Sequence, residues 1–180
     1  MKYTLIAMLL VAAGPALAAS DSPYEGQQAR QIKSLSDAEI GGLLRGDGMG
    51  FARAAELNHY PGPAHVLELA AELQLSERQL AQTRAIHERM NAAARRLGAQ
   101  LVDGEKALDE LFAQGTITAQ SLDRQLAIIG DIRSRLRGVH LLAHLEQRAL
   151  LTVHQVHRYD ALRGYLDGSH EHTHGHQGHN

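Results

Sequence analysis

The chain has 180 residues, of which 44% are hydrophobic and 4% aromatic, and its formal net charge is −2 with the twelve histidines taken as neutral. Charge this close to balance gives no electrostatic support for a nucleic-acid partner. The absence of cysteine excludes disulfides, thiolate metal sites and cysteine nucleophiles. The length suits a single domain, and the abundant Ala, Leu, Arg, Glu and Gln favour helix.

The first twenty residues, MKYTLIAMLLVAAGPALAAS, have the pattern of a secretory signal peptide. Lys2 supplies the positive start, residues 4–13 form a short apolar core, and Ala18 ends a small-x-small cleavage site. The apolar stretch is shorter than a membrane-spanning helix needs, although an uncleaved anchor is the alternative. We therefore expect residues 1–18 to be removed and the mature protein to be periplasmic and not membrane-spanning.

The next part of the chain predicts a polar lead-in followed by short helices. Residues 19–33 are polar and are expected to form a flexible lead-in to a helical domain over residues 34–167. Short helices are predicted over residues 37–45, 51–58 and 65–73. The glycine-rich turn GDGMG and the helix-breaking segment YPGP separate them.

Two long amphipathic helices are predicted by apolar residues that recur every three or four positions. The first runs from Ser76 to about Ala113, and the second begins after Thr118. Their apolar stripes are Leu80, Thr83, Ile86, Met90, Ala93, Leu97, Leu101, Leu108, Leu111 and Phe112, and then Leu122, Leu126, Ile129, Leu136, Val139 and Ala143. A short link containing Gly115 makes the two helices antiparallel. With a last helix over residues 153–166, the expected fold class is all-α: a long antiparallel helical hairpin with short flanking helices and flexible termini.

Four glycines lie inside the two predicted long helices, where each costs up to about 1 kcal/mol relative to alanine. They are Gly98, Gly104, Gly130 and Gly138. Bending of a helix or close approach of another element would account for them.

Three predicted helix starts share one pattern, in which Ser or Thr is followed three residues later by Glu or Gln. They are Leu35-Ser36-x-x-Glu39, Leu75-Ser76-x-x-Gln79 and Leu151-Thr152-x-x-Gln155. This is the capping box, in which the hydroxyl accepts from the N3 backbone N–H and the Glu or Gln side chain reaches back to the N-cap N–H. The third also matches the LTxxQ motif, and the second is its close variant.

With the signal peptide and the long hairpin, these two motifs resemble the Spy/CpxP superfamily of periplasmic proteins over about residues 34–167. The segments GDGMG and YPGPAHVLELA look like those of its periplasmic heavy-metal sensors, the ZraP and CnrX-like branch. The resemblance implies an all-helical homodimer or higher oligomer. ZraP- and CnrX-like members bind zinc, nickel or cobalt, Spy-like members hold unfolded client proteins without ATP, and CpxP-like members restrain a membrane sensor kinase.

The chain departs from two branches of that superfamily. It is slightly acidic, whereas the client surface of Spy is basic, and this weakens the chaperone interpretation. It also has no HxxxH pair in its early helical segment, where CnrX-like members carry metal ligands.

The C-terminal stretch SHEHTHGHQGHN belongs to a tail, residues 168–180, that we expect to be disordered and to capture metal. Its histidines are His170, His172, His174, His176 and His179. Alternate residues of an extended segment share a side, so the first four imidazoles can converge on Zn, Cu, Ni or Co, with Cu(II) favoured in a site that is not rigid. A solubilising tail or a purification tag is the alternative.

A histidine pair on the second long helix is a further candidate metal site. His140 and His144 are four residues apart and therefore share one helix face. Glu105 or Asp109, from the facing helix, is a guess for a third ligand. His140 also lies beside the apolar stripe, so a packed core histidine is the alternative.

His154 and His157, three apart on the last predicted helix, form another candidate pair. His87 is expected to be structural, and Met49 and Met90 are too few for a methionine-rich copper(I) site. No phosphate loop, nucleophile elbow or HExxH motif is present, so we expect no catalytic activity.

The expected function is that of a periplasmic metal-binding stress or metal-resistance protein, for heavy-metal sensing or buffering. Its cofactor would be a divalent transition metal. The alternatives are an ATP-independent holdase chaperone and a regulatory partner that restrains an envelope-stress sensor.

Overall fold

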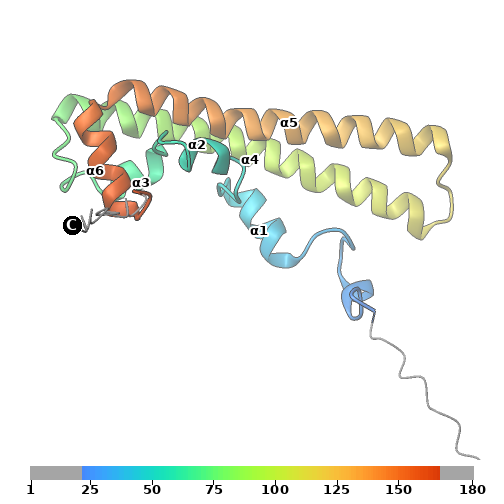
Figure 1. Ribbon diagram of the computed structural model, residues 1–180. Coiled ribbons are helices and arrows are strands. Elements are labelled where there is room, and N and C mark those ends of the chain that lie inside the picture. Colours follow the sequence, from blue (N-terminus) through green and yellow to red (C-terminus); the bar gives the residue numbers. More distant parts are fainter. Residues whose placement is uncertain (1–21, 167–180) are drawn as a thin grey trace, which may run out of the picture.

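The computed structural model describes residues 22–166 and confirms the all-α class (Figure 1). No β-strand occurs within that range. In chain order the helices are η1 (Gln27–Ala29), α1 (Asp37–Arg45), α2 (Arg53–Glu56), α3 (Pro63–Glu68), α4 (Glu77–Ala113), α5 (Ala119–Leu150) and α6 (Val153–Arg163). The predicted signal peptide and the histidine-rich tail lie outside the described residues.

The two long helices, α4 and α5, form the predicted antiparallel hairpin (Figure 1). With 37 residues α4 is about 55 Å long, at ~1.5 Å per residue. Helices α2, α3 and α6 gather at one end of this hairpin, and α1 packs against the middle of α4 (Figure 1). Over the described part of the chain, none of the helices combines the length and the apolar character that crossing a membrane requires.

Capping boxes set the beginnings of four helices. Both reciprocal hydrogen bonds are present at Ser36/Glu39, Ser76/Gln79, Thr118/Ser121 and Thr152/Gln155. Three of these boxes were predicted, and α1, α4 and α6 begin where they place them. The fourth uses a serine in place of the usual Glu or Gln.

The short helices are briefer than predicted. Helix α2 covers four residues and α3 six, against the eight and nine expected. Neither has a side-chain cap at its beginning, and α3 starts instead with Pro63, whose fixed φ suits the first helical position. Helix α6 ends at Arg163, three residues early, because Gly164 adopts the left-handed conformation with φ 71°.

The main core lies where α1 crosses the hairpin. Leu43 of α1 packs with Leu97 and Leu101 of α4 and with Leu136 of α5, and all four side chains are almost fully buried. Ile32, which precedes α1, is buried in the same cluster. Helix α1 therefore adds a third layer to the hairpin, but only along part of the hairpin's length.

Two residues assigned to the apolar stripes are exposed instead. Phe112 is 57% exposed and Leu126 is 49% exposed. Both lie toward the turn that joins α4 and α5, where no short helix packs on the hairpin (Figure 1). The periodicity of apolar residues marks the face of a helix that contacts its neighbour. Side chains at the edge of that face are buried only where a third element covers them.

The glutamines of the two LTxxQ-type motifs meet at the other end of the hairpin. Gln79 Nε2 donates to Gln155 Oε1 at 2.8 Å, and Gln155 Nε2 donates to Gln79 Oε1 at 3.2 Å. The Gln79 amide also donates to the backbone carbonyl of Leu150, and the Gln155 amide donates to that of Leu73. The caps of α4 and α6 are thereby joined to each other as well as to their own helices.

Candidate functional site

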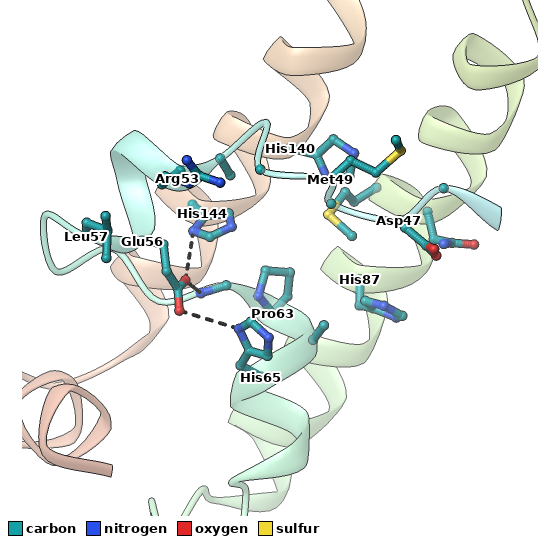
Figure 2. Close-up of a pocket in the computed structure, with 18 of the residues that line it drawn as sticks. Asp47, Met49, Arg53, Glu56, Leu57, Pro63, His65, His87, His140 and His144 are labelled. Atoms are coloured by element: carbon teal, nitrogen blue, oxygen red, sulfur yellow. Dashed lines mark hydrogen bonds and ion pairs between the residues drawn. The ribbon is translucent and has the colours of Figure 1, made fainter. Parts of the chain in front are cut away.

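A cavity of about 600 Å³ lies where the loops around α2 and α3 cover the hairpin (Figure 2). Its walls carry four of the histidines of residues 22–166, and both methionines of that range. These side chains are His65, His87, His140, His144, Met49 and Met90. They come from the α1–α2 loop and from α3, α4 and α5, so the fold gathers donors that are up to 95 residues apart.

His140 is the most deeply buried of these histidines, with 2% of its surface exposed. Its ring stacks on Phe51, with centroids 5.8 Å apart and planes 10° apart. Its Nε2 is shielded from solvent and has no hydrogen-bond partner among residues 22–166. Burial lowers the pKa of His140, and the neighbouring His144 lowers it further, so the ring is neutral at physiological pH. A neutral imidazole is the form that binds a metal.

His144, one turn further along α5, is also buried, but its ring is held by the loop before α3. Its Nδ1 lies 2.7 Å from the carbonyl oxygen of Tyr60. Because a carbonyl only accepts, Nδ1 carries the hydrogen in this contact. Its Nε2 faces Gly62, where a Cβ would lie only 3.0 Å away. Gly62 therefore leaves room for this ring at the cavity wall.

The carboxylate of Glu56 is the polar centre of this end of the molecule. Its side chain is 12% exposed, and the hydroxyls of Tyr159 and Tyr165 both donate hydrogen bonds to Oε1. The backbone N–H of Gly62 donates to Oε2 at 3.2 Å. Burial and the hydrogen bond to Glu56 raise the pKa of Tyr159, which keeps its phenol protonated as a donor. The short helix α2 is thereby tied to α6 and to the loop before α3.

Cationic and titratable groups also surround this carboxylate. His65 Nδ1 lies 3.4 Å from Oε1, and His144 Nδ1 lies 3.6 Å from Oε2 (Figure 2). Arg163 Nε is 3.7 Å from Oε1. One carboxylate from α2 thus contacts side chains of α3, α5 and α6, and it places a negative charge at the wall of the cavity.

The donors at this cavity are not by themselves a complete site for a divalent metal. Among residues 22–166, no three His, Cys, Asp or Glu side chains lie close enough together to hold an ion. The arrangement supplies one unpartnered buried imidazole, further imidazoles held by hydrogen bonds, and the two thioethers. A bound divalent metal would therefore need ligands in addition to those that the described residues bring together.

The predicted pair His140 and His144 lies on one face of α5 and lines one cavity. The guessed third ligands do not join it. Glu105 accepts a hydrogen bond from Ser34, and Asp109 pairs with Lys33 at 3.2 Å. Neither acid lines the cavity, because both belong to the part of α4 nearer the hairpin turn.

The predicted pair His154 and His157 lies on the exposed face of α6. Both residues line a second cavity, of about 480 Å³, together with Glu72. His170, His172, His174, His176 and His179 lie outside the described residues. The structure thus brings the helical pairs to two separate cavities.

Several residues of this site were not anticipated from the sequence, namely Glu56, Tyr159, Tyr165, Arg163, His87, Met49 and Met90. His87 lines the cavity although it was expected to be structural. The contacts of Glu56 with the two tyrosines span 103 and 109 residues, so no local spacing announces them. The sequence offered one signal for these contacts. Aromatic residues are scarce, so each tyrosine stands out, and the hydroxyl of a buried tyrosine needs a hydrogen-bond partner.

No protein-family model, curated protein or solved structure matches this chain.

Proposed function

We propose that this protein is a periplasmic metal-binding protein of the Spy/CpxP type that senses or buffers a divalent transition metal. The observation that carries the proposal is the His140 imidazole. It is neutral and buried, it has no hydrogen-bond partner within the described part of the chain, and it lies at a cavity lined by further histidines. A buried polar atom without a partner is costly, and binding an ion would satisfy it.

The donor chemistry supports a transition metal. Imidazole nitrogens suit Zn, Cu, Ni and Co, and thioethers such as those of Met49 and Met90 add affinity for copper. Calcium and magnesium prefer oxygen ligands, but both carboxylates at the cavity already have partners: tyrosine and backbone donors for Glu56, and Arg45 for Asp47. His140 would bind the ion through Nε2, and the thioethers lie on other elements of the same wall.

The position of the cavity supports sensing. Its donors lie on the hairpin helices α4 and α5 and also on the loop before α2 and on α3. An ion bound between them would fix the short helices against the hairpin, so occupancy would change how tightly this end packs. A partner protein, or a second copy of the chain in a homodimer or higher oligomer, would then bind differently to the metal-bound and metal-free forms.

Calorimetric titration of the mature chain with Zn(II), Cu(II), Ni(II) and Co(II) tests the proposal. We expect at least one ion to bind with a Kd of about 1 µM or tighter, near −8 kcal/mol. The variant that lacks the five tail histidines and carries His140→Gln should lose this binding. His59→Gln is the matched control, because this imidazole pairs with Asp160 and does not line the cavity. Absence of binding by the wild-type chain to all four ions would refute the proposal.

Exposed leucines on α5 favour holdase activity as a second candidate function. Leu142 and Leu145 are 58% and 51% exposed and lie three residues apart on one side of the helix. Apolar side chains of this kind are available to an unfolded client. The mature chain should then suppress aggregation of a denatured client with or without chelator, and Leu142→Gln/Leu145→Gln should weaken that effect. Equal suppression by both proteins would count against this surface.

A further inference from the structure

The cavity also holds two sulfur donors, and the first of them lies on a strained loop. Met49 belongs to the turn GDGMG and has a φ of 41°, in the left-handed region that residues other than glycine rarely adopt. Residues keep such a conformation only where the surrounding structure holds them, and they cluster at ligand sites. Here the N–H of Phe51 donates to the carbonyl of Gly48 at 2.7 Å and closes the turn around Met49.

Contacts on two sides place this loop between α1 and α5. The Met49 sulfur packs against the backbone of α1, because a Cβ on the buried Gly42 would lie only 3.0 Å from Sδ. Phe51, two residues further along the loop, stacks on the His140 ring of α5. Met49 and His140 both line the cavity, and Figure 2 shows their side chains at its wall. Because 43% of Met49 is exposed, an ion from solvent can reach its sulfur.

The second sulfur comes from the facing long helix. Met90 is half-buried on α4 and lines the same cavity. The α1–α2 loop, α4 and α5 therefore each bring one neutral donor to the wall. Methionine is unbranched and has three rotatable bonds, so both thioethers can turn towards His140 within a cavity of about 600 Å³.

His140 supplies the observation that points to a ligand at this wall. The residue is 2% exposed, and none of the residues 22–166 forms a hydrogen bond with its Nε2. A histidine that only fills a core has its ring nitrogens satisfied, because an unpaired buried polar atom is costly. The apolar ring of Phe51, on which His140 stacks, cannot be that partner. A bound ion would be one.

We propose that this cavity is a copper(I) site, in which the thioethers of Met49 and Met90 and the Nε2 of His140 hold the ion. The inference goes beyond the proposed function, because its ion is monovalent and two of its three ligands are sulfur. Two methionines are too few for a methionine-rich site, as the sequence indicates. The fold adds to them an imidazole that no described residue engages.

Ligand chemistry favours copper(I) over the divalent ions in this set. Thioethers select copper(I), whereas zinc takes thiolate, imidazole and carboxylate ligands and usually four of them. All three ligands proposed here are uncharged. The Born cost of burying an ion rises with the square of its charge, so a monovalent ion loses less hydration energy than a divalent one. An uncharged sulfur and nitrogen set therefore suits copper(I).

NMR of the methionine methyl groups tests the ligand set directly. In the mature chain, without residues 1–18, Met49 and Met90 are the only methionines, so labelling their methyl carbons with ¹³C gives one signal for each. The five tail histidines are changed to Gln, so that they cannot compete for the ion. Cu(I) without oxygen, and Ag(I) as its redox-inert substitute, should shift both signals together. If either signal does not shift, the ligand set is wrong.

Competition for Cu(I) with the chelator bicinchoninate measures the contribution of each ligand in the same background. Met49→Leu and Met90→Leu, which nearly conserve volume, and His140→Gln should each weaken Cu(I) binding by at least about tenfold. His59→Gln is the matched control, because its imidazole pairs with Asp160 and does not line the cavity. It should bind Cu(I) as the background does. Circular dichroism of each variant controls for loss of fold.

The two leucine variants also separate this inference from the proposed function. They should leave Zn(II) binding within about twofold of the background, because zinc does not need thioethers. If they bind Cu(I) as tightly as the background, the copper(I) site is wrong and the proposed function stands. If Cu(I) binding follows the expected pattern and the wild-type chain binds none of the four divalent ions, the copper(I) site stands and the proposed function fails. If no ion binds, both fail.

Discussion

Replacing Gly98 by alanine should separate α1 from the hairpin. A Cβ at Gly98 would overlap the carbonyl oxygen of Leu43 and lie 2.7 Å from its carbonyl carbon. These are backbone atoms, which cannot rotate away as the end of a side chain does. Because carbon atoms in contact lie ~3.5–4 Å apart, α1 would have to move outward by roughly 1 Å.

The magnitude follows from two opposing terms. Alanine is favoured over glycine inside a helix by about 1 kcal/mol. Overpacking costs about 1–3 kcal/mol, and backbone overlap beside the buried Leu43 indicates the upper end of that range. We expect Gly98→Ala to lower the free energy of unfolding by about 2 kcal/mol, since ~3 kcal/mol of strain exceeds ~1 kcal/mol of helix propensity.

Gly130→Ala is the matched control, because Gly130 is exposed on α5 and a Cβ there has no neighbour within 4 Å. It should raise the free energy of unfolding by up to about 1 kcal/mol. Gly104→Ala, whose Cβ would lie 3.2 Å from a side-chain carbon of Ile129, should fall between the two. Urea denaturation followed by circular dichroism measures all three variants. If Gly98→Ala is as stable as Gly130→Ala, the close approach of α1 is wrong.

Three further predictions concern buried polar groups. Gln155→Glu removes the donor to Gln79 and should lower the free energy of unfolding by about 1–3 kcal/mol. The control Glu39→Gln, in the exposed capping box of α1, should lower it by less. Equal losses in urea denaturation would contradict the amide pairing. Glu56→Gln should lower thermal stability by about 1–3 kcal/mol because the buried carboxylate accepts both tyrosine hydroxyls; an unchanged melting temperature would contradict this. The metal-free protein should lose stability as pH falls below 6.5, because the lowered pKa of His140 means that the unfolded state binds more protons than the folded state. Melting curves of His140→Gln should therefore depend less on pH than those of the wild type. An identical pH dependence would refute this role of His140.

The long helices could be predicted closely because their signals are local. The capping boxes at Ser76 and Thr152 fix where α4 and α6 begin, and the three- and four-residue spacing of apolar side chains marks the face that packs. The glycines show where local signals stop. Gly98 is required by the backbone of α1, whereas nothing in the structure accounts for Gly130.

The candidate site was predicted only in part. The spacing of His140 and His144 was enough to place both rings on one face of α5. It does not show that the His140 Nε2 has no hydrogen-bond partner among the residues the structure describes, nor that Glu56 reaches His144 from a helix of four residues. Those properties depend on how the loops around α2 and α3 cover the hairpin. Such packing is non-local and leaves no period in the sequence.

The reciprocal amide pair couples two distant positions, so we expect them to change together in evolution. Each glutamine both gives and receives a hydrogen bond, so a substitution at Gln79 alone leaves Gln155 with an unmatched group in a partly buried place, and the reverse also holds. A single step away from glutamine therefore passes through a less stable intermediate. The two motifs thus act as one structural unit, although their glutamines lie 76 residues apart in the chain.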